Sequence, residues 1–211
     1  MHAGRDHMDI SEVLRYAGVS TDADESLRQR AEQIAQELCN AISPKWVWRV
    51  LPSIDLPGQT AQTMLADCHS VCILVCTLGA AFDARLRAMQ ARDMSDALLL
   101  NAAGSALVEE GCDAAQREIA ARFPQAFLTD RFSPGYGDLP LSVQPMLCEL
   151  TDAQRRLGVH VTDTFLLNPV KTVTAVIGLS DRPQKARIRG CAYCGLRDTC
   201  SLRKGGKRCA L

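Results

Sequence analysis

Four cysteines near the C-terminus form the clearest chemical pattern in the chain. They are Cys191, Cys194, Cys200 and Cys209. A C-x2-C pair lets one tight turn direct two thiolates at a metal, and the later two cysteines complete a four-sulfur set. The surrounding residues are mostly polar or basic, so a metal would supply folding energy that burial does not. We predict a metal centre here, either zinc or an iron–sulfur cluster, because the later spacings match neither a common ferredoxin nor a zinc ribbon. A loose tail with free thiols is the alternative.

Three further cysteines follow a C-x3-C-x3-C spacing that also suggests a metal cluster. They are Cys68, Cys72 and Cys76, and the last two lie in a strongly apolar run. Free cysteine in such a run behaves as a small hydrophobic residue. We therefore predict that these thiols pack in the core, and we interpret the cysteines of the helical patterns in the same way: Cys39, Cys112 and Cys148.

A glycine-rich loop is the second candidate for chemistry. Arg131 and Phe132 precede Ser133-Pro134-Gly135-Tyr136-Gly137. Glycines let a backbone approach a ligand closely, an arginine can bind a carboxylate through two hydrogen bonds, and a tyrosine adds a flat ring with a hydroxyl group. An ordinary Pro-Gly turn explains the same residues without a ligand.

Charged residues elsewhere have simple default interpretations. Glu109 and Glu110 are expected on the solvated face of a helix unless a cationic ligand uses one of them. Lys171, which follows Asn168-Pro169, is expected to be a surface lysine. The sequence has no P-loop, no dinucleotide fingerprint and no nucleophile elbow, so nothing indicates a self-contained hydrolase.

Composition excludes several classes of protein. The chain has 211 residues, with 24 basic and 24 acidic side chains, and this balance argues against binding driven by nucleic-acid phosphates. No apolar stretch is long enough for a membrane span, and the N-terminus lacks the pattern of a secretory signal. We therefore expect a cytoplasmic protein, in which the ten cysteines are not paired as disulfides.

Hydrophobic periodicity predicts an α+β fold: a mixed, largely antiparallel twisted sheet packed against long helices, with a small Cys-rich C-terminal appendage. Helices are expected at residues 9–17, from about 21 to 43, from 79 to about 92, at 94–122 and at 142–157. Strands are expected at 46–50, 70–77 and 170–179, with an extended segment at 161–167. Small residues around Gly104 predict a close helix contact at the centre of the longest helix. We divide the chain into a domain at 1–185 and a metal-binding tail at 186–211.

The segment from Arg131 to Gln144 (RFSPGYGDLPLSVQ) resembles the reactivation domain of cobalamin-dependent methionine synthase, a family with an Arg-x-x-x-Gly-Tyr loop before a helix. Downstream, Thr162–Pro169 (TDTFLLNP) is similar to the family segment that ends in a proline before the final strand. Upstream, 76–80 and 96–110 look like its strand–helix–helix core. The resemblance covers about 10–180 and looks closest to short, free-standing activation proteins.

This resemblance implies that S-adenosylmethionine binds between the long helix and the Gly-Tyr loop. Arg131 would hold the ligand's carboxylate, the backbone of Ser133 and Gly135 would contact the adenosine, and Glu109 or Glu110 would face the positive end, with Glu109 preferred. Tyr136 would be the catalytic residue at the face turned to the corrin. The implied function is reductive methylation of inactive cobalamin, which the partner synthase carries, with S-adenosylmethionine as the methyl donor.

The Cys-rich tail is absent from the fused family domain, which suggests an additional role. An iron–sulfur cluster there could deliver the electron that reactivation needs, whereas with zinc the electron would come from a flavodoxin- or ferredoxin-like partner. The alternative function comes from a different class: a metal-binding or electron-transfer accessory module for another corrinoid protein, which does not use S-adenosylmethionine.

Overall fold

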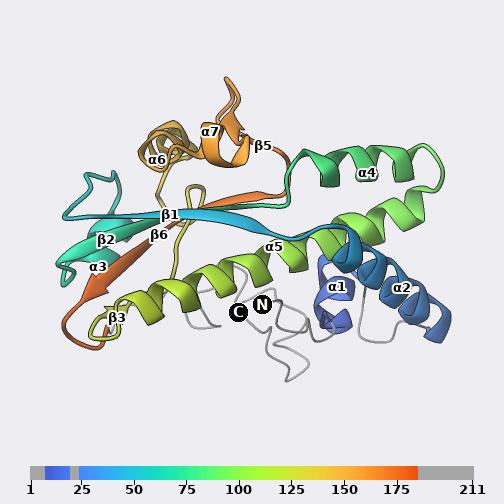
Figure 1. Cartoon of the computed structure of the whole chain (residues 1–211), viewed down its shortest axis with the longest axis horizontal. Coiled ribbons are helices and arrows are strands. Elements are labelled where there is room, and N and C mark those ends of the chain that lie inside the picture. Colours follow the sequence, from blue (N-terminus) through green and yellow to red (C-terminus); the bar gives the residue numbers. More distant parts are fainter. Residues whose placement is uncertain (1–7, 20–23, 185–211) are drawn as a thin grey trace.

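A computed structural model describes residues 8–19 and 24–184 of the chain. Its centre is an antiparallel sheet in which the strands are ordered β1-β2-β6-β3 (Figure 1). The strands are β1 (Lys45–Leu51), β2 (Ser70–Thr77), β6 (Thr172–Ser180) and β3 (Phe127–Leu128). A second small sheet pairs β4 (His160–Val161) with β5 (Leu167–Asn168).

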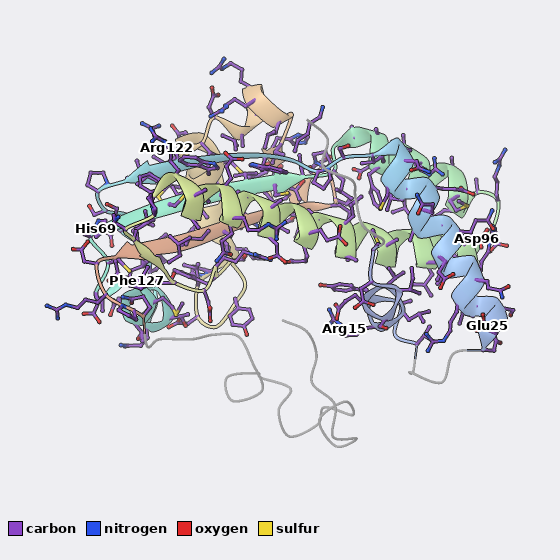
Figure 2. All side chains as sticks on the ribbon, turned by 60° about the horizontal axis from the view of Figure 1, so that its bottom comes forward. Arg15, Glu25, His69, Asp96, Arg122 and Phe127 are labelled. Carbon is purple, nitrogen blue, oxygen red and sulfur yellow. The ribbon has the colours of Figure 1, made fainter. Side chains whose placement is uncertain are left out.

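Helices cover both faces of the sheet (Figure 1). The long helix α5 (Met94–Arg122) crosses one face, while α6 (Gln144–Leu150) and α7 (Ala153–Leu157) lie over the other. At one end of α5 pack α1 (Ile10–Tyr16), α2 (Glu25–Ala41) and α4 (Ala80–Gln90). Figure 2 shows α2 beside the start of α5, where Arg30 donates to Asp96 at 2.8 Å. These layers confirm the expected α+β class. Among the described residues, no helix has the length and apolarity needed to cross a bilayer.

The strand β2 is buried from Val71 to Thr77 because both of its faces are covered. Cys72, Leu74 and Cys76 belong to the core cluster shared with α5, and Val71 and Ile73 belong to the cluster beneath α6. Cys72, Cys76, Cys112 and Cys148 are buried free thiols, while Cys39 and Cys68 are partly buried. Burial raises the pKa of the Cys72 thiol to about 12. The prediction that the cysteines pack in the core is confirmed for the four buried thiols.

The small residues of α5 do permit close contacts, as the sequence predicted. A Cβ atom at Gly104 would lie 2.4 Å from the ring of Phe82 on α4, which is fully buried. On β1, the indole N–H groups of Trp46 and Trp48 donate to Glu118 of α5 at 2.9 and 2.8 Å. The sheet and α5 are therefore joined by apolar packing and by two indole–carboxylate bonds.

Two expected elements differ from the structure, and one observed helix was not expected. The single helix expected at 142–157 is a 3-10 turn (Leu141–Val143) followed by α6 and α7, because Asp152 takes a left-handed conformation with φ of 54°. The helix α3 (Gln59–Leu65) was not predicted. In the segment 161–167 only the ends pair, since Phe165 has φ of 63° and lies in a turn.

Candidate functional site

Arg131 is buried against α5, with only 5% of its side chain exposed. Its Nη2 donates to Glu109 at 2.6 Å, and its Nη1 donates to Asp113 at 2.5 Å and to Gln116 at 3.1 Å. Burial opposes the charge of the guanidinium, but the hydrogen bonds to the two acids outweigh burial and raise the pKa of Arg131. The neighbouring Phe132 fixes this position by pairing with Val176 of β6 through backbone bonds of 3.0 and 2.8 Å.

Arg131, Glu109, Asp113 and Gln116 form a cluster, and the solvent-exposed part of this cluster is acidic. The side chains of Glu109 and Asp113 are 41% and 50% exposed, whereas Arg131 lies beneath them. One cation and two anions leave a net negative charge at the surface. This arrangement suits a positively charged ligand group. Glu109 is therefore a direct partner of the Arg131 guanidinium.

The glycine-rich loop after Arg131 is a compact turn. The N–H of Tyr136 donates to Ser133 at 3.0 Å, and the N–H of Gly135 donates to Leu139 at 2.7 Å. Gly135 has φ of 87°, a left-handed conformation that favours glycine. Tyr136 is 44% exposed. Its ring therefore lies at the surface of the loop and not in the core.

Asp138 ties this loop to the start of α3. Its carboxylate accepts the backbone N–H groups of Gln59 at 2.5 Å and Thr60 at 3.0 Å. Hydrogen bonds from the side chain and backbone of Thr60 are the main reason that the pKa of Asp138 lies below its usual value. The position of the loop therefore depends on a segment that is far away in the sequence. Sequence patterns alone did not reveal this contact for that reason.

Tyr16, which the sequence analysis did not select, lies on the short helix α1 near Glu109. Burial raises the pKa of the Tyr16 hydroxyl. The hydrogen bond with Arg15 opposes this shift, and the negative charge of Glu109 adds to it. The guanidinium carbon of Arg15 lies 4.2 Å from the centre of the Tyr16 ring, a cation–π distance. No motif spacing in the sequence signals this contribution, because it results from the packing of α1 on α5.

Lys171 is not the ordinary surface lysine that the sequence suggested. It is half-buried, and its Nζ donates to the hydroxyl of Ser105 on α5 at 2.7 Å. Burial lowers the pKa of Lys171, while the charge of Asp83 opposes that shift. Asp83 itself accepts the backbone N–H of Val170 at 3.3 and 3.2 Å. Ser105 and Glu109 are one helical turn apart on α5, so Lys171 contacts this helix one turn before the acid that pairs with Arg131.

The structure thus brings Arg131 and Glu109 into direct contact, and the chain continues from Arg131 into the loop with Ser133, Gly135 and Tyr136. Within the described residues, no group of three or more His, Cys, Asp or Glu side chains could hold a metal ion. The four predicted metal ligands lie outside the described residues: Cys191, Cys194, Cys200 and Cys209.

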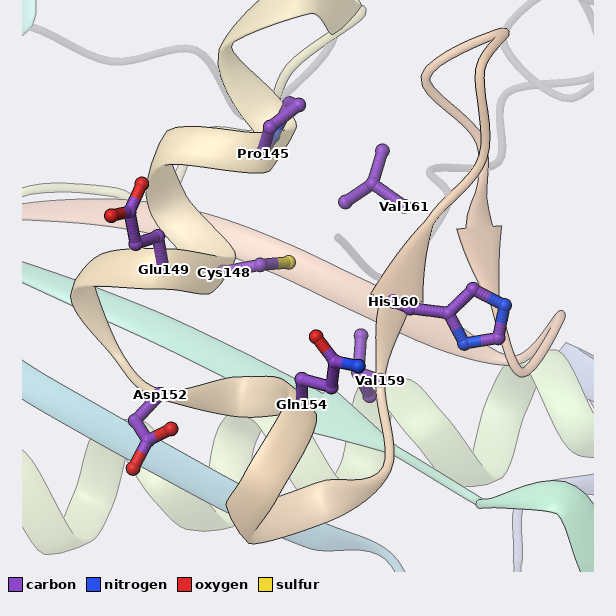
Figure 3. A pocket seen from close by; sticks show the side chains of 8 residues that line it. All are labelled: Pro145, Cys148, Glu149, Asp152, Gln154, Val159, His160 and Val161. Atoms are coloured by element: carbon purple, nitrogen blue, oxygen red, sulfur yellow. The ribbon is translucent and has the colours of Figure 1, made fainter.

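A separate hollow of about 360 Å³ lies between α6, α7 and β4 (Figure 3). It contains none of the predicted site residues, although the core thiol Cys148 points into it from α6. Burial raises the pKa of Cys148 to about 11, so this thiol is protonated at neutral pH and is a poor nucleophile. By its lining residues, this hollow is separate from the candidate site.

One solved structure with a similar fold is that of the MetH reactivation domain bound to AdoHcy, with a TM-score of 0.61 over 87% of this chain and 73% of that one. The two sequences are 14% identical, so the likeness establishes the fold. No family model matches the sequence. No curated protein matches it either.

Proposed function

We propose that this protein binds S-adenosylmethionine beside α5 and supports the reductive reactivation of a cobalamin-dependent methionine synthase. The observation that carries the proposal is the reactivation-domain fold, shared with a structure bound to AdoHcy, together with the cluster of Arg131, Glu109 and Asp113 next to the Gly-Tyr loop. AdoHcy is what remains of S-adenosylmethionine after its methyl group has been transferred.

The residues of the site match the groups of this ligand. S-adenosylmethionine carries a positive sulfonium and an ammonium, and the exposed carboxylates of Glu109 and Asp113 have the opposite charge. The backbone of Ser133 and Gly135 would contact the adenosine, since Gly135 has no side chain to prevent close approach. Tyr136, 44% exposed, would face the corrin of the partner.

The cobalamin of the partner supplies the cobalt nucleophile that accepts the methyl group after a one-electron reduction. The chain itself then needs no catalytic serine or cysteine. Its residues bind the methyl donor and orient it, and holding two reactants in a productive geometry is itself a large catalytic effect. Tyr136 is the residue we propose to stand between the donor and the corrin.

The tail at 186–211 would have a separate task from the domain at 1–185. We propose that its four cysteines bind one metal centre, and we favour an iron–sulfur cluster because reactivation requires an electron. Zinc would leave the electron to a flavodoxin- or ferredoxin-like partner. The ligands would be Cys191, Cys194, Cys200 and Cys209.

A reactivation assay tests the proposed function. Inactive methionine synthase is mixed with the full-length protein, a reductant and methyl-labelled S-adenosylmethionine, and the label on cobalamin is measured. We expect transfer that depends on this protein and that falls in Glu109→Gln, with Glu110→Gln as the matched control on the same helix. Equal loss or no loss in both variants would contradict the role of Glu109. Reactivation without S-adenosylmethionine would favour the accessory-module alternative.

A further inference from the structure

Two cysteines that the proposed function does not use meet in the core between β2 and α5. Cys76 lies on β2 and Cys112 on α5, and neither residue is exposed. Their thiols are hydrogen-bonded to each other, and the Cys76 thiol also donates to the backbone carbonyl of Val108 at 3.8 Å. Both cysteines are free. The two sulfur atoms are therefore already in contact across the interface between the helix and the sheet.

Gly111 allows this turn of α5 to approach Cys76. A Cβ atom at Gly111 would lie 2.8 Å from the Sγ atom of Cys76 and 2.5 Å from the Cβ atom of Pro44. Any side chain at this position would force the helix away from β2, because a packed core has no space to absorb it. Glycine is unfavourable inside a helix, so its position here agrees with a need for close approach. The contact between the two thiols thus depends on the residue next to Cys112.

The thiol pair is located on the inner side of a turn of α5 whose outer side is acidic. Cys112 directly precedes Asp113, and Glu109 lies on the preceding turn. The hydrogen bond with Cys76 and burial raise the pKa of the Cys112 thiol. The charge of Glu109 adds to this shift, and the charge of Arg131 opposes it. Since the thiolate is the reactive form, Cys112 resists bulky thiol reagents in the folded state. A small neutral oxidant can still reach it when this part of the helix opens locally.

We propose that Cys76 and Cys112 are a redox-active pair, which a peroxide oxidises to a disulfide that joins β2 to α5 and a dithiol reduces again. This inference depends on the fold alone and not on the proposed function. Oxidation would attach α5 covalently to the sheet at the turn that carries Glu109 and Asp113.

The oxidation proceeds in two balanced steps. One thiol loses its proton, and its sulfur attacks a peroxide oxygen. The O–O bond breaks, the sulfur becomes a sulfenic acid, and the other oxygen takes up the proton and leaves as water. The second thiol then attacks the sulfenic sulfur, the S–S bond forms, and the sulfenic oxygen leaves as a second water. The two thiols lose two electrons and two protons, and the peroxide takes up both. Because the sulfur atoms are already in contact, the second step has a favourable geometry.

Peptide mapping of the full-length protein after treatment with hydrogen peroxide tests the pair. The remaining thiols are alkylated in urea, and the protein is digested without reduction. We expect a linked peptide that contains Cys76 and Cys112 and that dithiothreitol separates. The linked peptide should be absent in Cys112→Ala. Cys72→Ala is the matched control that should retain it, because Cys72 is also buried on β2 but donates to the carbonyl of Ile73.

Urea denaturation gives a second measurement. Oxidised wild type should unfold at a higher urea concentration than reduced wild type, since a disulfide restricts the unfolded chain. This rise should be lost in Cys112→Ala, which keeps the cysteines of the tail and therefore controls for oxidation there.

Three outcomes overturn the proposal. The first is that Cys76 and Cys112 are both still alkylated after a peroxide treatment that oxidises other cysteines of the chain. The second is a sulfenic or sulfinic acid at one of the two without a bond between them, which would show that the sulfur atoms cannot close. The third is a linked peptide that forms only when peroxide is added in urea, which would assign the reaction to the unfolded chain. None of these measurements uses S-adenosylmethionine, so each of these failures leaves the proposed function intact.

Discussion

Replacing Gly104 by alanine tests the packing that brings Ser105 to Lys171. The new Cβ would lie 2.4 Å from Cε2 and from Cζ of Phe82, far inside the usual contact distance. Phe82 is fully buried and belongs to the main core cluster, so its ring has no open space to enter. The substitution must therefore move α4 away from α5 or distort the side-chain conformation of Phe82.

Two effects of opposite sign determine the change in the free energy of unfolding. Alanine within a helix is favoured over glycine by about 0.8–1.0 kcal/mol. Inserting a methyl group into a packed core typically costs about 1–3 kcal/mol. Because the contact at Gly104 is so short, we expect the upper half of that range. The net result is then a loss of stability of about 1–2 kcal/mol for Gly104→Ala.

Urea denaturation of Gly104→Ala, Phe82→Leu and the double variant measures this balance. The smaller leucine should make room for the methyl group, so the double variant should be more stable than the sum of the single changes predicts, by at least about 0.5 kcal/mol. A Gly104→Ala variant that is stabilised by about 1 kcal/mol would refute the reasoning, because helix propensity would then be the whole effect.

Three other predictions concern the loop and the tail. Tyr136→Ala should leave the melting temperature near wild type, since the ring is 44% exposed, and should slow reactivation of the synthase; a large stability loss with normal activity would give the ring a structural role. Asp138→Asn should lower the free energy of unfolding at neutral pH. The difference in this free energy between variant and wild type should shrink as the pH falls below about 4. The reason is that the pKa of Asp138 is lowered in the folded state, so its stabilising effect is lost as the carboxylate is protonated. A pH-independent gap in urea titrations would contradict that origin. Anaerobic purification should give a brown protein that contains iron and sulfide. A colourless protein with one zinc would reverse the choice of metal. Four freely reactive thiols without any metal would refute the metal site at Cys191, Cys194, Cys200 and Cys209.

Local sequence patterns predicted the elements whose signal lies within the element. The long helix was predicted at 94–122 and observed as Met94–Arg122, because Asp93 caps its start and Pro124 follows its end. The apolar run of β2 likewise agrees with its observed bounds. The last strand begins two residues later than predicted, at Thr172, since the N–H of Val170 is bonded to Asp83 and not to a neighbouring strand.

Contacts between distant residues were beyond these patterns. Arg131 meets Glu109 across 22 positions, and Lys171 meets Ser105 across 66. The helix α3 begins where Asp138, 79 residues away from Gln59, accepts its N–H groups. Periodicity identifies the face of an element, but it does not say which distant charge that face meets. The loop motif therefore indicated a site at Arg131, while the pairing of Arg131 with two acids required the fold.

Binding of S-adenosylmethionine to the purified full-length protein tests the central claim most directly. The account predicts one ligand per chain by titration calorimetry, with competition by AdoHcy, and weaker binding in Arg131→Met, because Glu109 and Asp113 lose the cation that positions them. Absence of binding heat for S-adenosylmethionine, together with no competition by AdoHcy in a labelled-ligand assay, would contradict it.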